Sequence, residues 1–161
     1  MFRAARTVVV GGWLFLIIGV LAAAANSWGF TVLQGIANPA ERQARAEYTV
    51  KAFLYHSIGH VDRKDAVTAV QRYFVRGLLG GALSLLMGIG LLSRREGGRK
   101  LCILISGLCF LWFIGNVLYL LRSGVAWLPD LLMRVAGMIG FLSVALGLTR
   151  SSIKAQFQRQ T

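Results

Sequence analysis

The only two histidines of the chain, His56 and His60, are four residues apart, which would place both imidazoles on one face of a helix. This spacing suits zinc or haem ligation, and Asp62 or Glu47 could supply a further zinc ligand. No glutamate follows His56, so the HExxH pattern of metalloproteases is absent. A helix break at Gly59 would separate the two rings. We therefore favour interfacial polar residues over a metal site, and we predict no bound cofactor.

Polar residues within the apolar runs are the second candidate chemistry. Arg134 follows Asp130 by one helical turn on the same face, and it is close enough to the interface to extend its guanidinium to water. We expect it to anchor the helix rather than handle a substrate or a proton. Asn116 is expected to hydrogen-bond to a neighbouring helix. The sequence contains no Ser-His-Asp arrangement and no phosphate-binding glycine loop, which favours a protein that is not an enzyme.

The elements that carry these residues follow from hydropathy. The chain has 161 residues, 56% of them hydrophobic, and a mean hydropathy of +0.62, which is too apolar for a soluble domain. The apolar residues form four runs separated by charge. They predict an all-α membrane protein, one domain over 1–161, with four transmembrane helices at about 7–25, 76–93, 101–121 and 130–149.

The charge distribution predicts how the chain crosses the membrane. The net charge is +12, but the cations flank the apolar runs, which indicates lipid headgroups rather than nucleic acid. Four cations lie in the predicted turn 94–100, where Gly97-Gly98 reverses the chain, and one lies in 122–130. The positive-inside rule therefore places 94–100, the N-terminus and the polar tail 150–161 in the cytoplasm of an inner (plasma) membrane.

The loop 29–75 is expected on the opposite side, with a short connector over 29–38. Asn38-Pro39-Ala40-Glu41 predicts a helix start, and an amphipathic helix should continue to about Ile58. It is too polar to span, so it should lie on the bilayer surface or against a partner. A long helix over 65–93 should follow. The aromatic residues expected at this surface are Tyr48, Phe53, Tyr55 and Phe74.

Two stripes of small residues predict close helix packing, because in lipid such stripes let another backbone approach. Either the second and fourth spans pack together, or each receives a helix from a partner. The stripes are Gly77, Gly81, Ser84 and Gly88 in the second span, and Ala136, Gly140, Ser143 and Gly147 in the fourth.

Three functions follow as hypotheses. The first is a non-enzymatic accessory or scaffold subunit of a larger inner-membrane complex, with other integral membrane subunits and lipids as partners. The second is a small channel or transporter formed by copies of this chain, although no acidic residue lies deep in a span. The third is a metal- or haem-binding membrane protein that uses His56 and His60.

Overall fold

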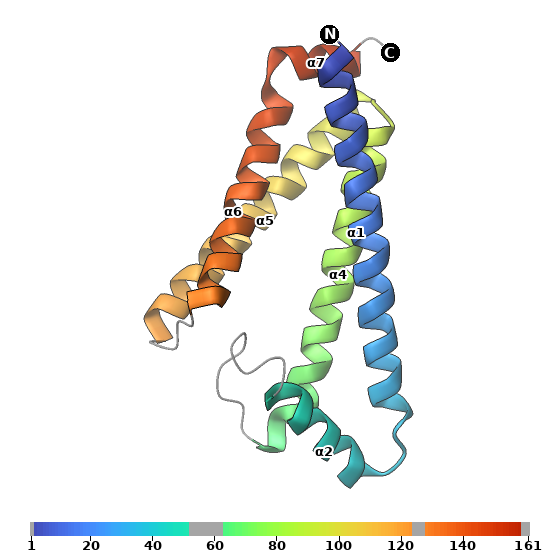
Figure 1. The fold of residues 1–161 in the computed structure, drawn as a ribbon, viewed down its shortest axis with the longest axis vertical. Coiled ribbons are helices and arrows are strands. Elements are labelled where there is room, and N and C mark those ends of the chain that lie inside the picture. The colour runs from blue at the N-terminus through green and yellow to red at the C-terminus, as the bar shows by residue number, and fades with distance from the viewer. Residues whose placement is uncertain (1, 52–62, 124–127, 159–161) are drawn as a thin grey trace. The chain divides into compact units, whose positions relative to one another are not determined.

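The computed structural model describes residues 2–51, 63–123 and 128–158, and helices make up every regular element in these ranges (Figure 1). This confirms the predicted all-helical class. In chain order the elements are α1 (Phe2–Gly35), α2 (Pro39–Thr49), the short 3-10 helix η2 (Arg63–Asp65), α4 (Ala66–Leu92), α5 (Glu96–Ser123), α6 (Leu128–Thr149) and α7 (Ser151–Gln158).

Four of these helices are long and apolar enough to cross a bilayer. Their candidate spans are Arg6–Gly35 in α1, Ala66–Leu92 in α4, Glu96–Tyr119 in α5 and Leu131–Thr149 in α6. Large apolar side chains are exposed along all four, as at Leu21 (63%), Leu111 (62%) and Met133 (75%). In water such surfaces would be costly, whereas lipid tails solvate them.

Helix α1 continues ten residues beyond the predicted end at 25. The side chain of Asn26, just past that predicted end, donates from Nδ2 to the carbonyl of Ala22 at 2.7 Å within the helix. The predicted connector over 29–38 is therefore wrong, because the chain leaves the helix only after Gly35. A 34-residue helix measures about 50 Å, which is longer than the roughly 30 Å hydrocarbon core.

Helix α2 begins where the sequence predicts. Asn38 is the N-cap and its side chain accepts a hydrogen bond from the Ala40 amide at 3.0 Å, while Pro39 occupies the first helical position. The helix ends at Thr49, and the predicted continuation to Ile58 lies outside the described residues. The long helix predicted over 65–93 is present as η2 followed by α4.

The charged turn is shorter than the predicted 94–100. Arg94 adopts a left-handed conformation with φ of 51°, which reverses the chain, and α5 begins at Glu96. Gly98 is therefore helical and does not form a turn. Its missing side chain matters instead for packing, because a Cβ there would collide with the Gly90 carbonyl of α4.

The residues predicted as a polar tail form a further helix, α7. Ile153 and Phe157 are four residues apart and therefore share one face of it, while Lys154 is exposed. The side chain of Phe157 is fully buried. Ile153 and Phe157 pack against the core of the protein, which explains why residues 151–158 form a helix.

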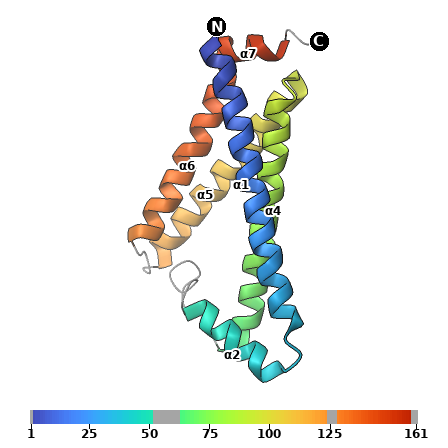
Figure 2. The same ribbon diagram turned by 45° about the vertical axis from the view of Figure 1, so that its right-hand side comes forward.

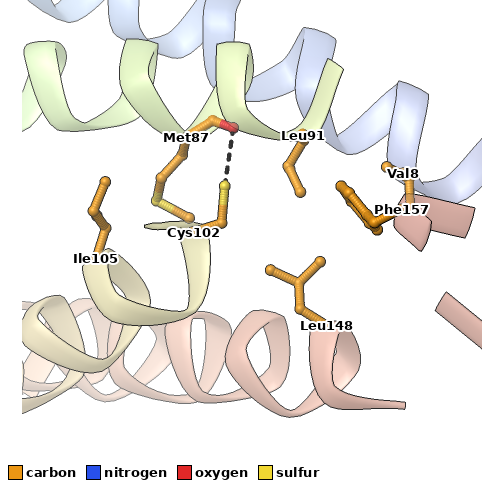
Figure 3. Close-up of a cluster of buried hydrophobic side chains, with 7 residues drawn as sticks. All are labelled: Val8, Met87, Leu91, Cys102, Ile105, Leu148 and Phe157. Carbon is orange, nitrogen blue, oxygen red and sulfur yellow. Dashed lines mark hydrogen bonds between the residues drawn. The ribbon is translucent and has the colours of Figure 1, made fainter. Parts of the chain in front are cut away.

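The chain divides into two compact units, and the first comprises Met1–Gly19 and Leu83–Thr161. Its core joins all five helices that enter this unit, and Phe157 of α7 lies next to Val8 of α1 (Figure 3). The cluster consists of Val8, Met87, Leu91, Cys102, Ile105, Leu148 and Phe157.

The second unit is Val20–Ala82 and has its own small core. The buried residues come from the end of α1, from α2 and Val50 directly after it, and from the start of α4. Within each unit α1 and α4 run side by side (Figure 2). The cluster consists of Leu33, Ala46, Val50, Ala66 and Val70.

Candidate functional site

A polar pair within the apolar helices joins α5 to α6. Nη1 of Arg134 donates to Oδ1 of Asn116 at 2.9 Å, and Nδ2 of Asn116 donates to the Trp112 carbonyl at 2.7 Å. Both side chains are half-buried. Because a cation is costly in hydrocarbon, the amide oxygen compensates part of the desolvation of the guanidinium. The pair can therefore hold a charge between the two helices and fix their register.

The same two helices pack closely one turn further along. A Cβ at Gly137 would lie 2.8 Å from Cε1 and Cζ of Phe113, so the ring lies directly against the α6 backbone. Phe113 also stacks on Phe141, with ring centroids 5.7 Å apart and planes inclined by 29°. Positions 134, 137 and 141 of α6 thus form the face that meets α5.

The small-residue stripe of α4 packs against α1. In the first unit a Cβ at Gly88 would lie 2.7 Å from Cγ of Leu16 and 2.9 Å from the Gly12 carbonyl. In the second unit the Asn26 side chain occupies the space beside Gly77. The sequence offered a pairing of the second span with the fourth. At Gly77 and Gly88 the neighbouring helix is instead α1.

The matching stripe of α6 is open. Apart from the neighbouring residues and nearby backbone of α6 itself, no heavy atom of the described chain lies within 4 Å of a Cβ built at Gly140 or Gly147, and Ala136 and Ser143 are exposed. This stripe lies beside, and not on, the face that meets α5. Two stripes with the same 4-3-4 spacing thus differ, because α1 covers one at Gly77 and Gly88 while the other has open space at Gly140 and Gly147.

Arg99 holds the start of α5 to the end of α6. Its Nε donates to Oε2 of Glu96 at 2.9 Å, and its Nη1 donates to the Leu148 carbonyl at 2.9 Å, 49 positions away. The Arg99 side chain is buried. A cation is favoured at a helix C-terminus, where carbonyls lack intrahelical partners. This contact accounts for the close approach of these two helix ends.

Small residues on α5 let α4 come close. The thiol of Cys102 donates to the Met87 carbonyl at 3.3 Å, and a Cβ at Gly90 would lie 2.9 Å from Sγ of Cys102. Ser106, one turn along, is fully buried, and its hydroxyl oxygen has no hydrogen-bond partner among the residues that the structure describes. Cys102 and Cys109 are both free thiols, so these side chains act in packing.

The predicted outer aromatic surface is only partly open. Tyr48 on α2 is 64% exposed, whereas Phe74 is half-buried and packs against the core of the second unit. The Phe74 ring lies against the backbone of Gly29, where a Cβ would be 2.5 Å from Cε1. Phe53 and Tyr55 lie outside the described residues.

The predicted ligand set also falls outside the described part of the chain. His56, His60 and Asp62 are not among the described residues, and neither is the side chain of Asp130. Across residues 2–51, 63–123 and 128–158, no three His, Cys, Asp or Glu side chains are grouped so that they could hold a metal ion.

Sequence reasoning missed two contact residues. Gly137 adjoins the small-residue stripe, but its contact with Phe113 depends on the register of α5 against α6, which periodicity does not give. Arg99 was one of four cations in the turn. Its spacing of three from Glu96 was a usable signal for a helical ion pair.

No protein-family model, curated protein or solved structure matches this chain.

Proposed function

We propose that the chain is a multi-pass protein of the inner (plasma) membrane, in which α1, α4, α5 and α6 cross the bilayer. The exposed apolar side chains on all four helices support this. The short α4–α5 connection is flanked by four cations within 94–100, whereas the α5–α6 connection has one, at Arg122. By the positive-inside rule both termini and the α4–α5 connection lie in the cytoplasm.

Within that membrane we propose a non-enzymatic accessory role, in which α6 binds a helix of an unlike integral membrane subunit. The observation that supports it most is the open stripe at Gly140 and Gly147. Lipid tails are as apolar as leucine, so helices associate there through close packing, which small residues permit. The α4 stripe shows this packing already in use, since Gly88 receives Leu16 of α1.

The rest of α6 suits this role. Its contacts with α5 through Gly137 and Arg134 hold it in one orientation, so the open stripe is presented by a rigid element. A preorganised face loses little freedom on binding. The exposed Tyr48 on α2 offers a second contact beyond the apolar part of the complex.

The proposal is tested by replacing Gly140 with leucine in the full chain and solubilising native membranes in mild detergent. The leucine fills the groove, so we expect the variant to lose most of the larger assembly that the wild-type chain forms on a native gel. Gly115→Leu is the matched control, because Gly115 on α5 is also exposed with open space around its Cβ. It should retain the assembly.

Three results would count against this function. Gly140→Leu could assemble as well as Gly115→Leu, or the wild-type chain could run as a lone monomer. An assembly that contains only copies of this chain would replace the unlike partner with self-association, the channel-like alternative.

A further inference from the structure

The second unit contains a cavity between α1, α2 and α4 that none of the roles above uses. Its volume is about 200 Å³. The lining combines apolar and aromatic side chains with one cation and one hydroxyl. These residues are Trp28, Gly29, Val32, Leu33, Arg45, Thr49, Val70 and Phe74.

The local sequence explains why the cavity exists. Arg42 ties α2 to the end of α1 by donating from Nε to the Ile36 carbonyl at 3.0 Å. Ala46 and Val50 are then buried against the α1 and α4 helices, and Arg45 and Thr49, one position before each, line the adjacent space. On α1 and α4 the lining consists of Trp28, Gly29, Val32, Leu33, Val70 and Phe74.

The polar part of the lining, Arg45 and Thr49, has one strong donor group. Among the residues that the structure describes, no hydrogen bond or ion pair engages the Arg45 guanidinium. The hydroxyl of Thr49 already donates to the Arg45 carbonyl at 2.9 Å. Arg45 therefore differs from Arg42, whose guanidinium is occupied by the Ile36 carbonyl. A guanidinium fork of this kind matches phosphate oxygens.

Several side chains that line the cavity are exposed, and these include the cation Arg45. Trp28 is 75% exposed and Val32 is 37% exposed, although both line the cavity. An indole that is apolar on one side and polar on the other is favoured at the boundary between lipid tails and headgroups. The cavity lining thus combines one exposed cation, Arg45, with exposed apolar side chains.

Size and charge select the class of ligand. A site that encloses a small molecule usually measures about 300–1,000 Å³, so about 200 Å³ holds only one end of a larger molecule. The described parts of this unit carry seven Lys and Arg residues against three Asp and Glu. An excess of cations favours a ligand with a negative charge.

We propose that this cavity binds the headgroup of an anionic phospholipid, with its phosphate on Arg45 and its first methylene groups against Trp28 and Val32. The remaining acyl chains stay in the bilayer. The lipid would bridge α1, α2 and α4 and so stabilise this unit.

The test is a native mass-spectrometry titration of the full chain in a neutral detergent with phosphatidylglycerol, phosphatidylcholine or inorganic phosphate. We expect one phosphatidylglycerol to bind at least about tenfold more tightly than phosphatidylcholine. Both lipids offer a phosphate to Arg45, but the choline cation of phosphatidylcholine would be repelled by the excess of cations in this unit. Arg45→Gln should weaken phosphatidylglycerol binding about tenfold. The matched control Arg72→Gln removes an exposed cation of the same unit that does not line the cavity, and it should bind as the wild type does.

A second variant, Val32→Trp, places a larger side chain at a lining position of the cavity without changing the charge. It should also weaken binding of phosphatidylglycerol. The proposal is overturned if Arg45→Gln binds phosphatidylglycerol like the wild type or if both lipids bind equally. Displacement of the lipid by millimolar inorganic phosphate would assign the cavity to a soluble anion and would also overturn it. None of these readouts depends on a partner at α6.

Discussion

The interaction between Asn116 and Arg134 shows how a few polar atoms can set the register of two apolar helices. The amide accepts from the guanidinium and donates to the Trp112 carbonyl, so both ends of its side chain are engaged. From sequence, Asn116 could be assigned to an interhelical bond, but not its partner. Arg134 was expected on the same face as Asp130 because four-residue spacing is visible in a sequence, and the side chain of Asp130 lies outside the described part of the chain. A contact 18 residues away, such as that with Asn116, requires the hairpin geometry.

Substitution of Asn116 or Arg134 should lower the free energy of unfolding, and the two effects should not be additive. In a double-mutant cycle with Asn116→Leu and Arg134→Leu, we expect a coupling free energy of about 1 kcal/mol. The measurement is unfolding of each purified variant by a denaturing detergent. Additive effects of the two substitutions would mean that the hydrogen bond contributes nothing to stability.

At the scale of elements, four apolar runs predicted four long helices. The residues at which these helices begin and end could not be predicted from the sequence. Helix α1 passes Asn26 because that side chain bonds back to Ala22. α5 starts before Gly98 because Arg94, and not a glycine, takes the left-handed conformation. Hydropathy does not encode either choice. The N-cap at Asn38 was predictable because its whole signal lies within four residues.

The adjacent glycines at the start of α5 should respond in opposite ways to alanine. A Cβ at Gly98 would meet the Gly90 carbonyl and would lie 2.7 Å from Oγ of Ser93, while one at Gly97 meets nothing within 4 Å. We expect Gly98→Ala to destabilise the protein by about 1–3 kcal/mol through overpacking. Gly97→Ala should be neutral or stabilise by up to about 1 kcal/mol through helix propensity.

Thermal unfolding in detergent measures both changes, and each variant is the other's control. Equal shifts in the unfolding midpoint would show that the α4–α5 crossing is not as close as described.

At the scale of the whole molecule, each unit buries a small core and leaves large apolar side chains exposed. This balance is explained if lipid surrounds the long helices. We propose that the open stripe on α6 then faces a partner helix and that the cavity beside Arg45 holds a lipid headgroup. The apolar composition of the chain predicted that lipid surrounds these helices. The difference between the two stripes required the structure, because both have the same spacing in the sequence.

Cysteine labelling on both sides of the membrane tests the four-span account most directly. Starting from a chain with Cys102 and Cys109 replaced by alanine, single cysteines at Gln43, Arg95 and Leu108 are treated with a membrane-impermeant maleimide. We expect position 43 to react in intact cells, position 95 to react only after the membrane is permeabilised, and position 108 to resist in both. Reaction of positions 43 and 95 from the same side, or free labelling at 108, would contradict the account.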